Sequence, residues 1–332
     1  MALDGKILRR ALDRYEEAEH RRAAEARRLR AEICEKDPRV AELDALLRAS
    51  VAEAAAAALD GGRDVQAAVA AIQEKNLAAQ EERAARIAAL GYPRGCIDEE
   101  PVCPLCGDRG WVGTEPCECL MRLYREEQRK ELSRLLDLQG ESFGQFRLDY
   151  YDDLPDPVTG ISPRRQMGMV LRICRSYAES FGPGSGNLFL TGNPGLGKTF
   201  LSACIAAAVS EKGYSVVYDT AVNVVSRFEE ARFGRRGEQE EADADVRRCL
   251  RCDLLILDDL GAEMITAFTV SAVYELLNTR LREGKSTVIS SNMSAEEIGR
   301  RYSLQIGSRL AGNYENLRFV GKDVRLLKKA EL

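Results

Sequence analysis

The second half of the chain alternates between short apolar runs and longer segments in which apolar residues recur every three to four positions. Runs of this length are typical of parallel strands buried on both faces, and the longer segments are typical of the helices that join such strands. We therefore expect an α/β domain with a doubly wound parallel sheet. The apolar runs predict strands at residues 187–191, 215–219, 251–259 and 286–292, and the longer periodicity predicts helices at 164–181, 198–211 and 269–282.

Residues 2–90 have a different pattern, rich in Ala, Arg, Glu and Leu and amphipathic throughout. Breakers at Asp37-Pro38 and at Asp60-Gly61-Gly62 divide this region into three predicted helices. The third begins near Asp64 and ends at Leu90. A helical bundle or a coiled-coil hairpin fits the pattern, and such helices usually pack on one another or on a partner. A solvated spacer is the alternative.

A glycine-rich segment lies between strand 187–191 and helix 198–211 and matches the phosphate-loop pattern G-x-x-x-x-G-K-[ST]. Glycines let backbone N–H groups close around phosphate oxygens, and the helix N-terminus adds partial positive charge. Lys198 supplies a point charge for the β- and γ-phosphates, and Thr199 is placed to bind Mg²⁺ through its hydroxyl. A chance turn without a ligand is the alternative. The predicted ATP-binding residues are Gly192, Asn193, Pro194, Gly195, Leu196, Gly197, Lys198 and Thr199.

Polar side chains end two of the other predicted strands. Asp258 and Asp259 close one apolar run, and Asn292 closes the next. Paired acids at such a position suit a Mg²⁺ ligand followed by a group that orients water. Because nucleotides bind at the carboxyl ends of parallel strands, we expect these three residues to converge with the phosphate loop. The sequence therefore predicts a nucleoside triphosphate hydrolase.

Length, composition and charge exclude some classes of protein for this chain. With 332 residues, 45% of them hydrophobic, the chain is long enough for two domains. The net charge of −5 gives no global basic field, so any contact with DNA must come from local patches. The sequence begins without an apolar segment of signal-peptide length and has no apolar run long enough to span a membrane. We expect a cytoplasmic protein without membrane contact.

Four of the ten cysteines form a cluster at Cys103, Cys106, Cys117 and Cys119. In the cytoplasm thiols stay reduced, so a disulfide framework is not expected. The C-x-x-C-Gly turn followed by a second pair ten residues later predicts a structural Zn²⁺ site. The tight Cys117-x-Cys119 spacing is unusual, and an iron–sulfur cluster or four unmetallated thiols are the alternatives. The single histidine, His20, is far from the cluster and reads as a solvated residue on a helix.

Taken together, these motifs resemble the helicase-loader branch of the AAA+ ATPases, the DnaC/DnaI type, with the transposition helper IstB as a close relative. The resemblance covers nearly the whole chain and includes the helical N-terminal region and the four-cysteine knuckle. Its ATPase motifs are Leu257-Asp258-Asp259-Leu260-Gly261, Ser290-Ser291-Asn292, Gly307-Ser308-Arg309-Leu310 and Gly321-Lys322-Asp323-Val324-Arg325.

The resemblance implies a role for each motif residue. Lys198 and Thr199 would hold phosphate and Mg²⁺, with Asp258 as a second Mg²⁺ ligand. Asp259 would orient the attacking water, and Asn292 would sense the γ-phosphate. Arg309 resembles an arginine finger that reaches into a neighbouring subunit, and Arg325 resembles the second sensor arginine. Ordinary surface ion pairs are the alternative for both arginines.

Two departures from the wider AAA+ pattern affect the expected mechanism. Many members have Asp-Glu where this chain has Asp258-Asp259, so the shorter carboxylate predicts slow hydrolysis, with ATP as a timed switch. Glu263 is a less favoured substitute for the water-orienting group. The sequence ends seven residues after Arg325, which predicts an ATPase core without a C-terminal helical lid.

The resulting expectation is an α/β AAA+ P-loop ATPase preceded by a helical region with a zinc knuckle. The predicted divisions are a helical partner-binding region (1–95), the knuckle (96–124), a linker helix with an aromatic segment (125–185) and the ATPase core (186–332). The resemblance implies ATP, Mg²⁺ and Zn²⁺ as cofactors. It implies a DnaB-type hexameric replicative helicase, single-stranded DNA and further copies of the chain as partners.

The leading functional hypothesis is a loader of the replicative helicase. An IstB-like transposition or phage-encoded ATPase that acts on duplex DNA is the second, and a nucleotide-gated adaptor without useful hydrolysis is the third. The knuckle favours the first, since IstB is not expected to have one. Candidate DNA-backbone contacts are Arg227, Arg232, Arg235 and Arg236; the alternative is a solvated face paired to Glu229, Glu230 and Glu238.

Overall fold

We analysed a computed structural model of the chain, which describes all residues except 1–2, 60–64, 99–100, 136–141, 159 and 331–332. The predicted breaker at 60–62 and the predicted helix start at Asp64 lie outside the described residues. The chain forms two compact units, Met1–Ala11 with Leu120–Leu332, and Leu12–Cys119. We call them the ATPase unit and the knuckle unit and describe each by itself. Within the described residues, no helix combines the length and the apolar character that crossing a bilayer requires.

The ATPase unit is built on a sheet of five parallel strands in the order β4-β5-β6-β3-β7. The four predicted strands are confirmed to within a few residues. The fifth, β7, pairs with β3 and was not predicted, because its sequence Tyr-Glu-Asn-Leu-Arg lacks an apolar run. The strands are β3 (Asn187–Thr191), β4 (Val216–Thr220), β5 (Leu254–Asp258), β6 (Ser286–Ser291) and β7 (Tyr314–Arg318).

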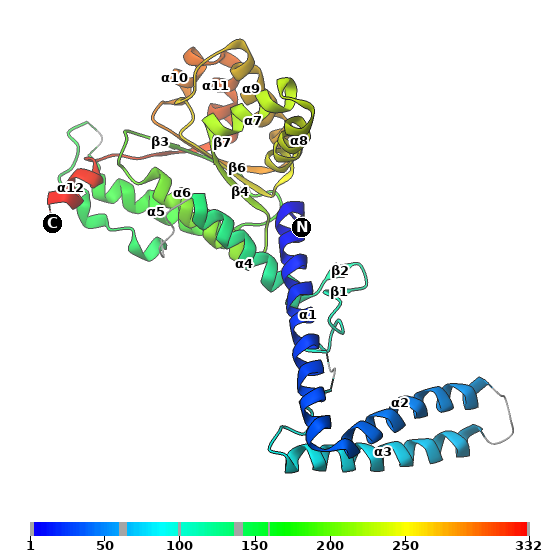
Figure 1. Cartoon of the computed structure of the whole chain (residues 1–332). Helices are drawn as coiled ribbons and strands as arrows, with labels where there is room; N and C mark the ends of the chain where they lie inside the picture. The colour runs from blue at the N-terminus through cyan, green and yellow to red at the C-terminus, as the bar shows by residue number, and fades with distance from the viewer. Residues whose placement is uncertain (1–2, 60–64, 99–100, 136–141, 159, 331–332) are drawn as a thin grey trace. The chain divides into compact units, whose positions relative to one another are not determined.

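Helices cover both faces of this sheet. One face carries α5 (Pro163–Ser180) and α6 (Lys198–Glu211), and the other carries α7 (Ala221–Phe233), α8 (Arg236–Arg251), α9 (Ala267–Arg282), α10 (Ala295–Arg301) and α11 (Leu304–Asn313) (Figure 1). The acidic segment at 238–245 is therefore helical, within α8. The remaining elements are α4 (Glu118–Leu135), two short 3₁₀ turns (Phe143–Gln145 and Leu148–Tyr150) and α12 (Val324–Ala330).

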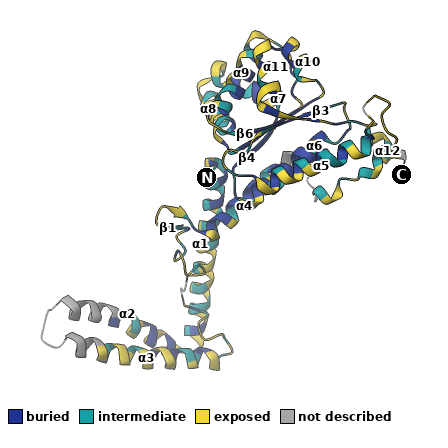
Figure 2. Ribbon diagram, turned by 180° about the vertical axis from the view of Figure 1, so that it is seen from behind, coloured by how far each residue is buried: buried dark blue, intermediate teal, exposed yellow. Residues whose placement is uncertain are grey.

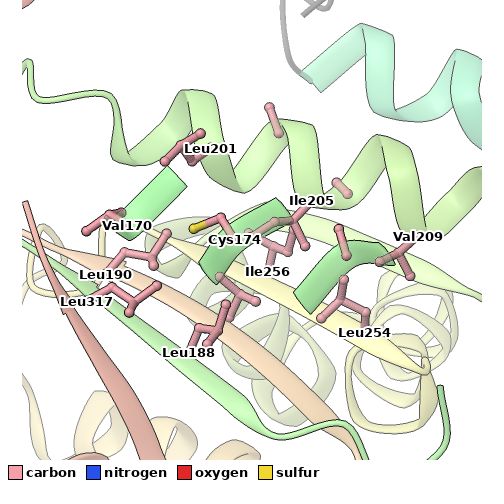
Figure 3. Packing of buried hydrophobic residues seen from close by; sticks show 14 of the residues in the cluster. Val170, Cys174, Leu188, Leu190, Leu201, Ile205, Val209, Leu254, Ile256 and Leu317 are labelled. Carbon is pink, nitrogen blue, oxygen red and sulfur yellow. The ribbon is translucent and has the colours of Figure 1, made fainter. Parts of the chain in front are cut away.

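β3, β4, β5 and β6 are buried on both faces, as their apolar sequences predict (Figure 2). Alternate side chains of β3 enter different cores: Leu188 and Leu190 pack with α5 and α6, whereas Phe189 packs on the opposite side. In the first core, Leu188 and Leu190 meet Cys174 of α5 and Ile205 of α6 (Figure 3). Each such side chain contributes about 1.5–3 kcal/mol by leaving water. This double burial fixes the strands, and hence the strand ends that carry the polar residues.

The first residues of the chain pack on the ATPase unit. The Asp4 backbone N–H donates to the Tyr124 hydroxyl at 2.9 Å, and Arg248 contacts the Asp4 carboxylate at 2.5 Å. Lys6 contacts Asp245 of α8 at 2.6 Å. The hydrophobic pattern did not predict these contacts of the N-terminal residues. They are polar contacts and ion pairs between segments more than a hundred residues apart in the sequence.

The knuckle unit contains most of α1 (Gly5–Lys36), together with α2 (Pro38–Leu59) and α3 (Val65–Ala89). The predicted break at Asp37-Pro38 is confirmed, and α3 ends before Gly91, whose φ of 85° fits the left-handed residue after a helix. Ile33, Val40 and Ile87 are fully buried where the three helices meet. A short hairpin, β1 (Trp111–Val112) and β2 (Glu115–Pro116), separates the two cysteine pairs.

Candidate nucleotide and metal sites

The phosphate loop joins β3 to α6 and is held by segments from far along the chain. The Tyr151 hydroxyl donates to the Leu196 carbonyl at 2.9 Å, and the Val324 N–H donates to the Gly195 carbonyl at 3.0 Å. Gly195 has φ of 77°, and a Cβ there would run into the Asp323 carboxylate. The positive φ therefore favours glycine at this position, and a larger side chain would also require Asp323 to move.

Lys198 lies at the first position of α6 and is 7% exposed. Its Nζ donates to the Gly192 carbonyl at 2.6 Å, to the Asn193 carbonyl at 2.9 Å and to Asn292 Oδ1 at 2.7 Å. Burial lowers the pKa of Lys198, while the nearby carboxylates of Asp259 and Asp258 act in the opposite direction. The ammonium is thus fixed at the mouth of the loop, where a phosphate would meet it.

Asp258 ends β5 and accepts three hydrogen bonds. Tyr218 of β4 donates its hydroxyl to Oδ2 at 2.7 Å, Thr199 donates to the same oxygen at 3.2 Å, and Ser290 of β6 donates to Oδ1. The predicted pair Thr199 and Asp258 is therefore brought together. A hydroxyl and a carboxylate at this distance offer the oxygen ligands that Mg²⁺ prefers.

Asn292 lies between Lys198 and Asp259. Its Nδ2 donates to Asp259 Oδ1 at 3.0 Å, while its Oδ1 accepts from Lys198. The three residues follow β6, β3 and β5, which are neighbours in the sheet, so their carboxyl ends open on one edge. This places the predicted polar residues in one cluster.

Asp259 has a left-handed backbone with φ of 57°, which is uncommon for a residue other than glycine. The Asp259 N–H donates to Ser290 Oγ at 2.9 Å, and this bond holds the turn. Such conformations cost about 1–3 kcal/mol and cluster at functional sites. In this conformation the Asp259 carboxylate accepts from Asn292 Nδ2 at 3.0 Å.

These residues line a cavity of about 630 Å³, within the usual range for small-ligand sites. Its wall also includes residues that motif reasoning missed. Among them, Phe146 stacks on Tyr151 with ring centroids 5.7 Å apart, and Lys328 of α12 adds a cation beside Arg325. Part of this wall comes from the aromatic segment at residues 143–151, which the sequence indicated only as the entry to the second domain. The missed lining residues are Gln145, Phe146, Arg147, Tyr150, Tyr151, Phe200, Thr220 and Lys328, while Ser290 and Val324 lie within quoted motifs to which no site role was given.

The two arginines to which the family resemblance gives catalytic roles lie in different places. Arg325 lines the cavity, whereas Arg309 of α11 does not. Arg309 Nη2 contacts the Tyr274 hydroxyl at 2.9 Å and Asn278 Oδ1 at 2.8 Å, both on α9. Arg309 is therefore away from the nucleotide cavity of its own subunit.

Glu263 is also outside the cavity lining. It is 4% exposed, and its carboxylate accepts from the Gly261 N–H at 2.9 Å and from the Tyr302 hydroxyl. These bonds hold the loop after β5, so the geometry gives no support to Glu263 as a substitute for Asp259.

The four candidate DNA-binding arginines are not equivalent. Arg227 contacts the buried carboxylate of Asp219 at 2.8 Å and is half-buried. The side chains of Arg232, Arg235 and Arg236 are exposed, at the junction of α7 and α8. Of the four, Arg227 is thus engaged within the subunit.

The four-cysteine cluster lies entirely within the knuckle unit. The four sulfur atoms are within 4.8 Å of one another, with Cys103 and Cys117 Sγ 3.7 Å apart and Cys106 and Cys119 Sγ 3.5 Å apart. A tetrahedral Zn²⁺ with bonds of about 2.3 Å needs sulfurs about 3.8 Å apart. The donor set therefore fits one zinc ion. An iron–sulfur cluster distributes its cysteines over several irons separated by sulfide, which needs a wider arrangement.

Comparison with known proteins agrees with this geometry. Residues 168–305 match the family of IstB-like ATP binding proteins. The replicative helicase loader DnaI of Bacillus subtilis is 28% identical over 199 residues, which are 58% of this chain and 58% of DnaI. An insertion sequence ATP-binding protein of Sinorhizobium fredii is 31% identical over 114 residues, which are 34% of this chain and 36% of that protein.

The replicative helicase loader DnaC of Escherichia coli is 24% identical over 136 residues, covering 41% of this chain and 54% of DnaC. The chain thus spans about half the length of the curated relatives it matches, or less. The matched region contains the phosphate loop, the β5 acids and Asn292, together with β3, β4, β5 and β6 of the sheet. Residues 168–305 are therefore similar to the IstB-like ATP binding proteins, and the chain is also similar to the helicase loaders DnaI and DnaC.

Proposed function

We propose that this chain is an ATP-dependent loader that places a DnaB-type hexameric replicative helicase on single-stranded DNA. The observation that carries the proposal is the pairing of a nucleotide site with a four-cysteine knuckle on helices, in a chain whose similarity to DnaI extends over 199 residues. The helical region (1–95) and the knuckle would hold the helicase, and the ATPase unit would handle DNA. Such a protein works in the cytoplasm.

In the nucleotide site, Lys198 binds the β- and γ-phosphates, and the loop N–H groups surround them. Thr199 and Asp258 would hold Mg²⁺, which neutralises phosphate charge when bound. Asp259 orients the attacking water, with Asn292 fixing the carboxylate at 3.0 Å. Because the Asp259 side chain is one methylene shorter than that of glutamate, and one of its two carboxylate oxygens accepts from Asn292, we expect slow turnover.

We further propose that the complete catalytic site forms between two subunits. Arg309 is outside the cavity of its own subunit, and it is oriented by Tyr274 and Asn278, with its guanidinium 4.4 Å from the Tyr274 ring centre. A half-buried arginine that is oriented in this way suits action on a neighbour's γ-phosphate. ATP-dependent self-association would then control hydrolysis.

Single-stranded DNA would lie near the junction of α7 and α8. Arg232, Arg235 and Arg236 are exposed there, and Phe233 is 70% exposed with its ring 5.4 Å from Phe268. Exposed cations beside an aromatic face suit the backbone and bases of single strands. Four thiolates, from Cys103, Cys106, Cys117 and Cys119, would hold one structural Zn²⁺.

The test is to mix the chain with the host's replicative helicase in ATP, in ADP and without nucleotide, and to measure complexes by native mass spectrometry. We expect a complex that transfers the helicase to circular single-stranded DNA in an ATP-dependent manner. The Lys198→Ala variant is the control for the nucleotide step. Absence of a complex in all three conditions would contradict the proposal.

An IstB-like helper is the second candidate, because an insertion sequence relative is 31% identical. It would bind duplex DNA and a transposase instead of the helicase. Preference for duplex over single-stranded DNA, together with a neighbouring transposase gene, would favour this alternative.

A further inference from the structure

A tyrosine from the long first helix lies against the four-cysteine cluster. The Tyr15 hydroxyl is 3.5 Å from Cys119 Sγ and 3.8 Å from Cys106 Sγ. These two sulfurs belong to different cysteine pairs, so one hydroxyl bridges both halves of the cluster. Tyr15 is part of the knuckle unit, as are all four cysteines.

The same helix contacts the knuckle at a second point. Arg22 Nη2 lies 2.8 Å from the Asp108 carboxylate. That carboxylate also accepts from the Cys103 N–H at 2.9 Å and from the Val102 N–H at 3.0 Å, so it fixes the turn that carries the first cysteine pair. Tyr15 and Arg22 are seven positions apart and therefore lie on one face of the helix.

The chemistry of a zinc–thiolate site gives Tyr15 a reason to be there. Four thiolates around one Zn²⁺ leave a net charge of about −2, and this charge is stabilised by hydrogen-bond donors. A phenol with an ordinary pKa near 10 keeps its proton at neutral pH and can donate it. Partners of this kind fix ligand orientation and are worth about 10- to 100-fold in metal affinity.

We propose that Tyr15 is a positioning residue of the zinc site, whose hydroxyl donates to the metal-bound thiolates of Cys106 and Cys119. Zinc binding then fastens the face of α1 that carries Tyr15 and Arg22 to the knuckle. The metal thus orders a helix as well as a loop. This inference rests on the proposed zinc site.

The first experiment removes only the hydroxyl. The full chain with Tyr15→Phe is compared with wild type for zinc content and for the rate of zinc transfer to a chromophoric chelator. We expect stoichiometric zinc in both proteins, with release about 10-fold or more faster from the variant. Tyr92→Phe is the matched control, because the Tyr92 hydroxyl contacts Glu32 and Lys36 in the same unit and no sulfur.

The possible outcomes distinguish failure of the zinc site from failure of the role of Tyr15. Wild type purified without zinc would overturn the zinc site itself. Stoichiometric zinc in wild type, with equal release rates from Tyr15→Phe and Tyr92→Phe, would overturn the role of Tyr15 alone.

A second measurement needs no variant. Hydrogen exchange of residues 12–24 is followed in wild type before and after chelation. We expect protection of this segment to fall by at least 10-fold when zinc is removed, and to return when zinc is added. Protection that is unchanged by chelation would overturn the fastening of α1 by the metal.

Discussion

The nucleotide pocket and the four-cysteine cluster are both polar sites, but they are organised in different ways. The pocket gathers residues from Gln145 to Lys328, and the strands that lead to its polar residues are anchored in two large apolar clusters. The four cysteines lie within residues 103–119. The two pairs are separated by a hairpin whose strands, β1 and β2, have two residues each.

The difference concerns what each site needs in order to exist. The sheet is held by buried side chains on both faces, so the pocket is formed by the fold and its ligand is added afterwards. The cysteine turns bury little apolar surface, and in small sites of this kind the metal supplies the folding free energy. Losing a ligand should therefore cost function at the first site and structure at the second.

Metal removal should give the largest contrast. Chelation of the full chain is expected to abolish amide protection across 103–119 and to leave protection of β3 within about twofold, because only the knuckle depends on metal. Hydrogen exchange with mass spectrometry measures both in one sample. Equal loss in both regions, or no loss in either, would remove the contrast.

Asp259→Asn should separate binding from chemistry in the pocket. The amide keeps the size of the side chain but accepts protons poorly, so we expect ATP affinity within about threefold of wild type and turnover lower by about 10²-fold or more. Asp253→Asn is the control, since Asp253 lies at the opposite end of β5 and contacts Ser215 and Lys285. A variant that turns over normally would exclude Asp259 from catalysis.

Subunit mixing asks whether the pocket, unlike the cysteine cluster, needs a second chain. Arg309→Ala and Lys198→Ala proteins should each be nearly inactive, and their mixture should recover about a quarter of the wild-type ATPase rate if one chain supplies Arg309 to the other's Lys198. Rates are measured over a dilution series. A mixture no more active than its parts would show that each subunit works alone.

Tyr218→Phe should have the smallest effect. It removes one of the three hydroxyl donors to Asp258 and keeps the apolar ring, so Mg²⁺-dependent ATP affinity should fall by about 3- to 10-fold, the net effect of one typical hydrogen bond. Tyr177→Phe, whose hydroxyl contacts the Gly186 carbonyl, is the control. Titration of Mg²⁺ at fixed ATP measures the difference, and equal midpoints would show that Tyr218 does not support Asp258.

The sequence predicted those parts of each site whose residues are close together along the chain. The phosphate loop, the acids after β5 and Asn292 were found because they follow apolar strands directly, and the cysteines were found by their spacing. The convergence of Lys198, Asp259 and Asn292 followed from the parallel sheet and is confirmed at hydrogen-bond distance.

The residues that were missed reach their sites from distant segments. Tyr218 contacts Asp258 across 40 positions, and Tyr15 reaches Cys119 across 104. Neither tyrosine belongs to a motif. In sequence, a tyrosine in a predicted strand or helix indicates no more than a side chain that packs against its neighbours. β7 was missed because two of its five residues are charged and only two are apolar. Contacts of this kind depend on tertiary packing, which local pattern does not encode.

The central claim is that the cavity around Lys198 binds Mg·ATP, and calorimetric titration of Lys198→Ala tests it most directly. Lys212→Ala is the matched control, because Lys212 follows the other end of α6. We predict that wild type and Lys212→Ala bind Mg·ATP alike and that Lys198→Ala loses at least about 100-fold in affinity, since a charge-assisted contact to phosphate is removed. Unchanged affinity in Lys198→Ala would contradict the account.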